Sequence, residues 1–221
     1  MIFGAYSNQA VNTKLSNGYD LFHWVMRKNC FPSFWARNLQ GTTRLTKEEI
    51  MYLRQNNCRI VPVLNGLSET EVAQADATIQ AKRAVQELHR LGVPDEGRIA
   101  VMAYLHPRWC INHNWMLSYA SNILSEGYLP GFIGNTDSSV NFSFNREMGH
   151  FLRAARANGI LTPVVWASEP KMSLPNEWLP YCCSDMTRQE ISFWQYGEEK
   201  CGEETAQIVL ARDKFVLANT W

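Results

Sequence analysis

The sequence carries no excess of charge of either sign. Its 21 basic and 21 acidic side chains give a formal net charge of zero, and they are spread along the 221 residues rather than gathered in blocks. Binding to nucleic acid or to an anionic membrane surface depends on clustered basic charge. The sequence therefore predicts no nucleic-acid partner and no membrane partner, and it leaves the oligomeric state open.

Segments that direct a chain into or across a membrane are also missing. Residues 1–10 contain no basic stretch followed by an apolar one, so they do not resemble a signal peptide. No apolar run approaches the roughly 20 residues of a membrane-spanning helix. The location, and with it export, stays open, with the cytoplasm as the default, and we expect reduced thiols. The six irregularly spaced cysteines are Cys30, Cys58, Cys110, Cys182, Cys183 and Cys201.

Several motifs of cofactor and nucleophile chemistry are absent. There is no glycine-rich phosphate loop and no Gly-x-Ser-x-Gly elbow, so we expect no cofactor. His106, Cys110 and His113 have a spacing that can bind zinc, but no fourth ligand is obvious. We therefore expect no metal, and a metal-dependent hydrolase built on these three residues is the least favoured function.

Apolar runs and amphipathic segments alternate along the chain. With 46% hydrophobic residues the chain can bury a full core, and near-continuous apolar runs are typical of parallel strands covered on both faces. Strands are expected at 19–24, 34–39, 59–64, 99–105, 129–133, 162–167, 191–196 and 207–211. Capping boxes and terminal glycines predict helices at about 46–54, 68–91, 114–126 and 145–158.

This alternation predicts an α/β fold. We expect a single TIM-type (β/α)8 barrel over residues 1–221, with 1–17 as an N-terminal extension. Little chain remains for helices after the last strands, so irregularity is expected there. A doubly wound open sheet is the competing fold, but residues 25–28 lack the glycines that usually follow its first strand.

The segments 18–24, 164–168 and 191–196 each carry a short motif, and these motifs resemble those of the family-twenty-five lysozymes. Residues 18–24 (Gly-Tyr-Asp-Leu-Phe-His-Trp) are similar to that family's first strand, and 164–168 are similar to an apolar-Trp-apolar-Ala strand. Residues 191–196 resemble its penultimate strand, which ends in Trp-Gln-Tyr. A related group of glycoside-hydrolase-like barrels has similar segments in the same order. Here these segments are 34–39, 45–49, 59–63 and 92–94. The resemblance implies a barrel that binds a carbohydrate such as a cell-wall glycan.

One departure from the family bears directly on activity. The resemblance implies an Asp-x-Glu pair at the end of strand four, where alternate residues point the same way. Here Met102 and Tyr104 stand at those positions. Two functions stay open: hydrolysis of a glycan by other carboxylates, or a non-catalytic barrel that binds a carbohydrate or another partner.

Polar residues near the carboxyl ends of the expected strands are the site candidates, because barrel enzymes place their chemistry there. The candidate catalytic carboxylates are Asp20, Asp137, Glu169 and Asp213. The candidate substrate-binding residues are Arg37, Tyr104, His106, Asn135, Trp166 and Gln195.

Each candidate also has a structural interpretation. For Asp20 the site is favoured, and its structural alternatives are a cap or a partner for Arg37, a cation inside an apolar strand. Tyr104 is a conceivable nucleophile with His106 as its base, although filling the mouth or stacking on a sugar is favoured.

The remaining candidates divide between site and structure in the same way. Asn135 and Asp137 have the composition of a turn. Trp166 is the better candidate for the site, and Trp194 for the core.

Overall fold

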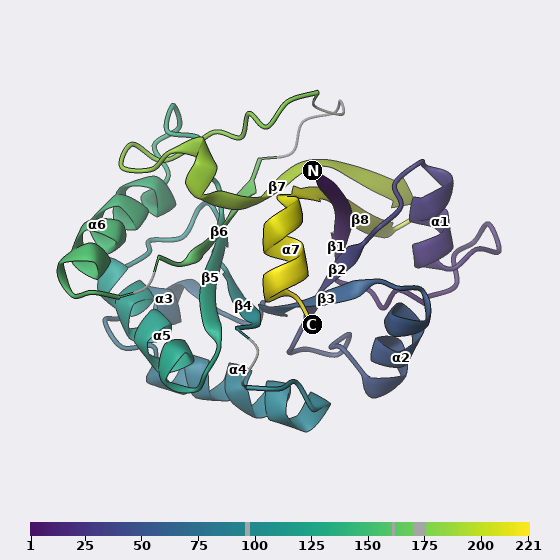
Figure 1. Cartoon of the computed structure of the whole chain (residues 1–221), viewed down its shortest axis with the longest axis horizontal. Helices are drawn as coiled ribbons and strands as arrows, with labels where there is room; N and C mark the ends of the chain where they lie inside the picture. The colour runs from purple at the N-terminus through teal and green to yellow at the C-terminus, as the bar shows by residue number, and fades with distance from the viewer. Residues whose placement is uncertain (96–97, 161, 170–175) are drawn as a thin grey trace.

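The protein is described by a computed structural model that covers all residues except 96–97, 161 and 170–175, and except the side chains of 213, 215 and 217. Its strands close into a barrel in the order β1 to β8 (Figure 1). The strands are β1 (Ile2–Ser7), β2 (Phe34–Asn38), β3 (Arg59–Leu64), β4 (Ala100–Tyr104), β5 (Leu129–Gly134), β6 (Val164–Ser168), β7 (Ile191–Cys201) and β8 (Glu204–Ala211). The α-helices are α1 (Leu21–Arg27), α2 (Lys47–Gln55), α3 (Glu69–Val72), α4 (Thr78–Leu91), α5 (His113–Ser125), α6 (Ser143–Ala157) and α7 (Asp213–Asn219). Within the described part of the chain, no helix is long and apolar enough to cross a membrane.

The expected (β/α) barrel is confirmed, and it is irregular at its last strands, as expected. Neighbouring strands from β1 to β7 pair in parallel. The last strand, β8, pairs antiparallel with both β7 and β1. A direct hairpin thus replaces the final helical crossover, and the sheet still closes without a free edge.

Alternate strand residues fill the inside of the barrel. Phe34, Met102, Trp166 and Phe193 belong to one buried cluster that occupies the interior. Residues of the opposite strand faces join a second, larger cluster with the inward faces of the helices. The barrel is therefore a packed core rather than a pore, as is usual for eight strands.

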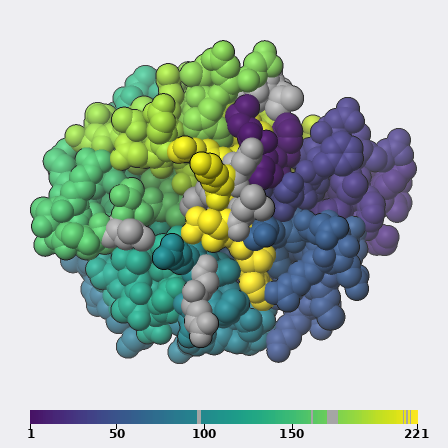
Figure 2. Space-filling model, viewed as in Figure 1, coloured from purple at the N-terminus to yellow at the C-terminus, as the bar shows by residue number. Residues whose placement is uncertain are grey.

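The amino end of the barrel is covered by α7. Val216 of this helix joins the interior cluster, and the backbone of Trp221 exchanges two hydrogen bonds with Ile60 of β3. In Figure 1, α7 lies at the centre of the view, and its yellow atoms lie at the centre of the same face in Figure 2. The open mouth lies at the other end, where the parallel strands finish.

The prediction of a first strand at 19–24 was wrong. Leu21, Phe22 and Val25 are the buried face of helix α1, and Asp20 is its N-cap. The first barrel strand is instead β1, within the residues that were expected to be an N-terminal extension. The likeness of 18–24 to the lysozyme first strand therefore does not correspond to a strand here.

The helix expected at 68–91 is divided in two. Ser68 opens the short helix α3 with a complete capping box, as predicted. The second helix, α4, begins at Thr78, where the Asp76 carboxylate accepts hydrogen bonds from the Thr78 N–H and hydroxyl. Helices α5 and α6 lie within two residues of their expected bounds.

Candidate functional site

A cavity of about 290 Å³ opens at the mouth of the barrel. Its lining residues are Tyr6, Ser7, Asn8, Asn65, Tyr104, Ser168, Gln195, Thr205 and Gln207. Most of them end a parallel strand or follow it directly, and the last three come from the β7–β8 hairpin. All nine side chains carry neutral hydroxyl, phenol or amide groups.

Two phenols stand on the strand side of the cavity. The Tyr6 hydroxyl donates to Asn38 Oδ1 at 3.0 Å, and Asn38 Nδ2 donates to Asn8 Oδ1 at 3.0 Å. Burial raises the pKa of Tyr6, and burial also raises the pKa of Tyr104. Both phenols are therefore neutral at ordinary pH and are suited to form hydrogen bonds with a ligand.

A chain of amides orients the other side of the cavity. Ser168 Oγ donates to Gln195 Oε1 at 3.2 Å, and Gln195 Nε2 donates to Gln207 Oε1 at 2.8 Å. Gln207 Nε2 donates in turn to a carboxylate oxygen of Glu198 at 3.3 Å. The hydrogen bond from Lys200 is the main cause that lowers the pKa of Glu198. This series of hydrogen bonds therefore ends on an ionised acceptor. The carboxylate of Glu198 fixes which end of each amide donates and which end accepts.

Asn65 follows β3 at the mouth and offers an unused acceptor. Its Oδ1 atom is buried and has no hydrogen-bond partner among the described residues. A buried polar atom without a partner costs free energy, which a ligand hydroxyl placed in the cavity would recover.

No protein-family model and no curated protein matches the sequence. Solved structures do match, over nearly the whole chain. An uncharacterised B. stearothermophilus protein is 21% identical with a TM-score of 0.81, over 100% of both chains. The bacterial lysozyme from Streptomyces coelicolor is 11% identical with a TM-score of 0.60, covering 99% of this chain and 97% of its own. A family GH25 lysozyme from Aspergillus fumigatus is 11% identical with a TM-score of 0.53, over 99% of both chains. The chain has the barrel fold of the GH25 lysozymes.

Strand four of this GH25-like barrel presents no carboxylate to the mouth. Met102 is fully buried in the interior cluster, and Tyr104, two residues further on, lines the cavity. Both side chains therefore point inward, as the alternation of a strand requires. Among the described residues no hydrogen bond joins Tyr104 to His106, whose Nδ1 accepts from the Arg108 N–H at 3.2 Å. His106 does not line the cavity.

The four candidate catalytic carboxylates occupy separate places on the GH25-like barrel. Asp20 caps α1 and accepts hydrogen bonds from the His23 N–H at 2.9 Å and the Tyr52 hydroxyl at 3.0 Å. Asp137 accepts from Ser139 in a turn. Of the four candidates, the three whose side chains are described do not line the cavity.

The other two carboxylates lie after β6 and after β8. Glu169 is buried, and its Oε1 accepts from the Tyr181 N–H at 2.7 Å and from the Thr136 hydroxyl at 3.2 Å. Asp213 begins α7 at the amino end of the GH25-like barrel, and its side chain lies outside the described residues.

The alternative pairing of Asp20 with Arg37 does not form. Arg37 faces outward from β2 toward α2, where its Nε lies 2.6 Å from Glu49 Oε1. Asn135 does not line the cavity either. Its Oδ1 accepts from the Asp137 N–H at 2.9 Å in a turn.

The two tryptophans lie on opposite faces of the sheet. Trp166 is fully buried inside the GH25-like barrel, with ring centroids 6.0 Å from Tyr6 and 5.0 Å from Phe193. Trp194 packs in the outer layer against Trp178, at 5.9 Å. Of the predicted substrate-binding residues, the cavity therefore includes Tyr104 and Gln195.

Sequence reasoning missed most of the lining. Tyr6, Ser7 and Asn8 were overlooked because residues 1–17 were taken as an extension, although 2–6 is an apolar run that ends in polar residues. Asn65 stands directly after the expected strand 59–64 and could have been found by the same rule.

Proposed function

We propose that the mouth of this GH25-like barrel binds a hydroxyl-rich carbohydrate without hydrolysing it, and that a cell-wall glycan is the favoured class of ligand. The observation that carries the proposal is the lining of nine neutral polar side chains. Sugar hydroxyls both donate and accept hydrogen bonds, which suits amide and hydroxyl groups in both roles. The lysozymes among the similar structures support a glycan as the ligand.

The chemistry of the mouth argues against glycoside hydrolysis. Most glycosidases need one carboxylic acid to protonate the leaving group and one carboxylate as base or nucleophile. Among the described carboxylates, Glu198 is the one that accepts a hydrogen bond from a lining side chain, that of Gln207. Its lowered pKa opposes the role of general acid. Met102 and Tyr104 supply neither group.

The first test is binding, measured by calorimetry with chitin oligosaccharides and soluble peptidoglycan fragments. Asn65→Ala and Gln195→Ala should each weaken binding by roughly 3- to 10-fold, since a neutral hydrogen bond contributes about 0.5–1.5 kcal/mol. Gln55→Ala is the matched control, because Gln55 is an exposed amide at the end of α2.

The same glycans should be assayed for released reducing ends. We expect saturable binding without turnover. Turnover by the wild-type chain would overturn the non-catalytic proposal, and an absence of saturable binding to every glycan would overturn the carbohydrate proposal. Binding that Asn65→Ala and Gln195→Ala leave unchanged would place the ligand elsewhere.

A further inference from the structure

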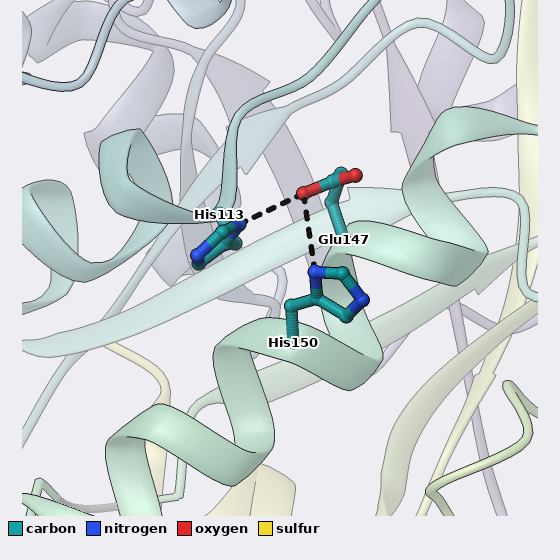
Figure 3. Close-up of side chains that lie close together, drawn as sticks. All are labelled: His113, Glu147 and His150. Atoms are coloured by element: carbon teal, nitrogen blue, oxygen red, sulfur yellow. Dashed lines mark hydrogen bonds and ion pairs between the residues drawn. The ribbon is translucent and has the colours of Figure 1, made fainter.

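A compact cluster of metal-ligating side chains lies outside the mouth, between α5 and α6. Figure 3 shows His113 at the start of α5 facing Glu147 and His150, which lie three residues apart on α6. One ligand atom from each residue can be chosen so that all three lie within 4.8 Å of one another. Residues three apart on a helix share a face, so α6 presents both of its ligands together.

The orientation of the three groups favours a shared ion. The Nδ1 atoms of His113 and His150 lie 2.9 Å and 3.9 Å from the same carboxylate oxygen, Glu147 Oε2. Two ligands bound about 2.0–2.1 Å from a tetrahedral zinc lie roughly 3.3 Å apart, which falls between these two separations. Two imidazole nitrogens and one carboxylate oxygen therefore converge on one small volume.

The surroundings prepare the carboxylate for this role. Arg146 Nε donates to the other oxygen, Glu147 Oε1, at 2.7 Å, and thereby orients the carboxylate. The side chain of Glu147 is 10% exposed, whereas those of His113 and His150 are 31% and 43% exposed, so an ion can enter from solvent.

We propose that His113, Glu147 and His150 bind one divalent transition-metal ion of the zinc class. Two imidazoles and one carboxylate are ligands that zinc accepts, and three protein ligands leave a position for water. The ion joins the beginning of α5 to α6 and stabilises the packing of these two helices. His106 and Cys110, which share the sequence spacing with His113, are not part of the cluster.

Zinc binding to the whole chain should be measured by competition with a chromophoric chelator. We expect one equivalent to bind, and we expect a rise in the unfolding temperature with zinc concentration. Loss of an outer-shell partner weakens a metal site by roughly 10- to 100-fold, so His150→Ala, which removes a direct ligand, should weaken binding by more than that. His113→Ala and Glu147→Gln should act in the same direction.

Two controls separate this site from adventitious binding. His89→Ala removes an exposed histidine on α4, and Cys110→Ser removes an exposed thiol, so both should leave the affinity unchanged. Bound Co²⁺ should show ligand-field bands without a thiolate charge-transfer band. The proposal is wrong if the wild-type chain binds no zinc, or if binding survives in folded His150→Ala and is lost in Cys110→Ser.

Discussion

Arg37 and Glu49 form an ion pair in which both side chains are almost fully buried, at 0% and 1% exposure. The Arg37 guanidinium also donates to the carbonyl oxygens of Ser7 and Thr43, and Glu49 Oε1 accepts from the Val11 N–H at 2.9 Å. The pair therefore connects β1, β2 and α2 through groups that have no access to water.

Neutralising one member of this pair should be costly. In Glu49→Gln the charge of Arg37 would stay buried without a counter-ion, so we expect a loss of about 3–5 kcal/mol in the free energy of unfolding. Urea denaturation at neutral pH measures this loss. Glu48→Gln changes an exposed neighbour on the same helix and should leave the denaturation midpoint near that of the wild type. A Glu49→Gln midpoint equal to that of the control would contradict the prediction.

The sequence predicts the need of Arg37 for a carboxylate but not which carboxylate meets it. In the sequence, Thr46 and Glu49 form the capping box that predicts the helix at 46–54, and the Thr46 hydroxyl does accept from the Glu49 N–H at 3.2 Å. Its carboxylate is turned instead toward Arg37. A capping rule describes neighbours along the chain, whereas the pair depends on where β2 and α2 meet in space.

Helix α1 depends on its N-cap. Asp20 accepts from the His23 N–H, so Asp20→Ala should lower the free energy of unfolding by about 1 kcal/mol. Asp20→Asn keeps an acceptor at the cap and should lose less. An equal loss in both variants would show that charge, not the cap hydrogen bond, is what matters.

The effect of Asp20 should depend on pH. Burial opposes ionisation of Asp20, but hydrogen bonds from the His23 N–H, the His23 ring and Tyr52 outweigh it, so its pKa in the folded state is lowered. This contribution is present above the unfolded-state pKa of about 3.9 and is lost as the pH falls through the lower folded value. The stability difference between wild type and Asp20→Ala, measured by urea denaturation from neutral to acid pH, should therefore shrink at the acid end. A difference that is constant with pH would contradict the assignment.

Most elements could be predicted from the sequence because their boundaries are encoded locally. The terminal glycines that predict the ends of three helices are Gly92, Gly127 and Gly159. The helices do end just before them, and the three glycines have positive φ angles of 77°, 83° and 65°. Residues 19–24 were misassigned because a short apolar run fits a strand and a helix equally well. The N-cap chemistry of Asp20 was the local feature that favoured a helix.

In the whole molecule, the inside of the barrel is filled so closely that a side chain at Gly131 would displace a neighbouring group. Gly131 of β5 lies beside Met102 of β4 in the sheet register. A Cβ atom at Gly131 would overlap the Met102 sulfur and lie 3.1 Å from Val164 Cβ. The Met102 side chain therefore packs over the neighbouring strand.

Gly131→Ala should destabilise the protein by about 1–3 kcal/mol through overpacking, as measured by urea denaturation. Met102→Ala alone should also destabilise it, because it leaves a cavity. The double variant should lose less than the sum of the two, since the smaller residue at 102 makes room for the new methyl group. Strict additivity would mean that the two residues do not compete for the same space.

The barrel as a whole could be predicted from the alternation of strands and helices, but the composition of its mouth could not. Gln195 was identified from a motif, and Tyr104 from its place on strand four. Asn8 and Gln207 reach the same cavity from opposite ends of the chain. That meeting depends on the pairing of β1 with β8, which no local pattern encodes.

The pairing of β1 with β8 also has a consequence for the time course of folding. Gly4 is in register with Val209, so the sheet closes through contacts between residues more than 200 positions apart. Folding rates fall as such distant contacts become more numerous, because a long loop must lose its freedom before the contact forms. On the ribosome, β1 emerges before the other barrel strands, yet its second partner, β8, is the last of the eight to be made. Its unpaired edge therefore stays open until all eight strands have been synthesised, and this is the stage at which chaperone binding would protect the chain best.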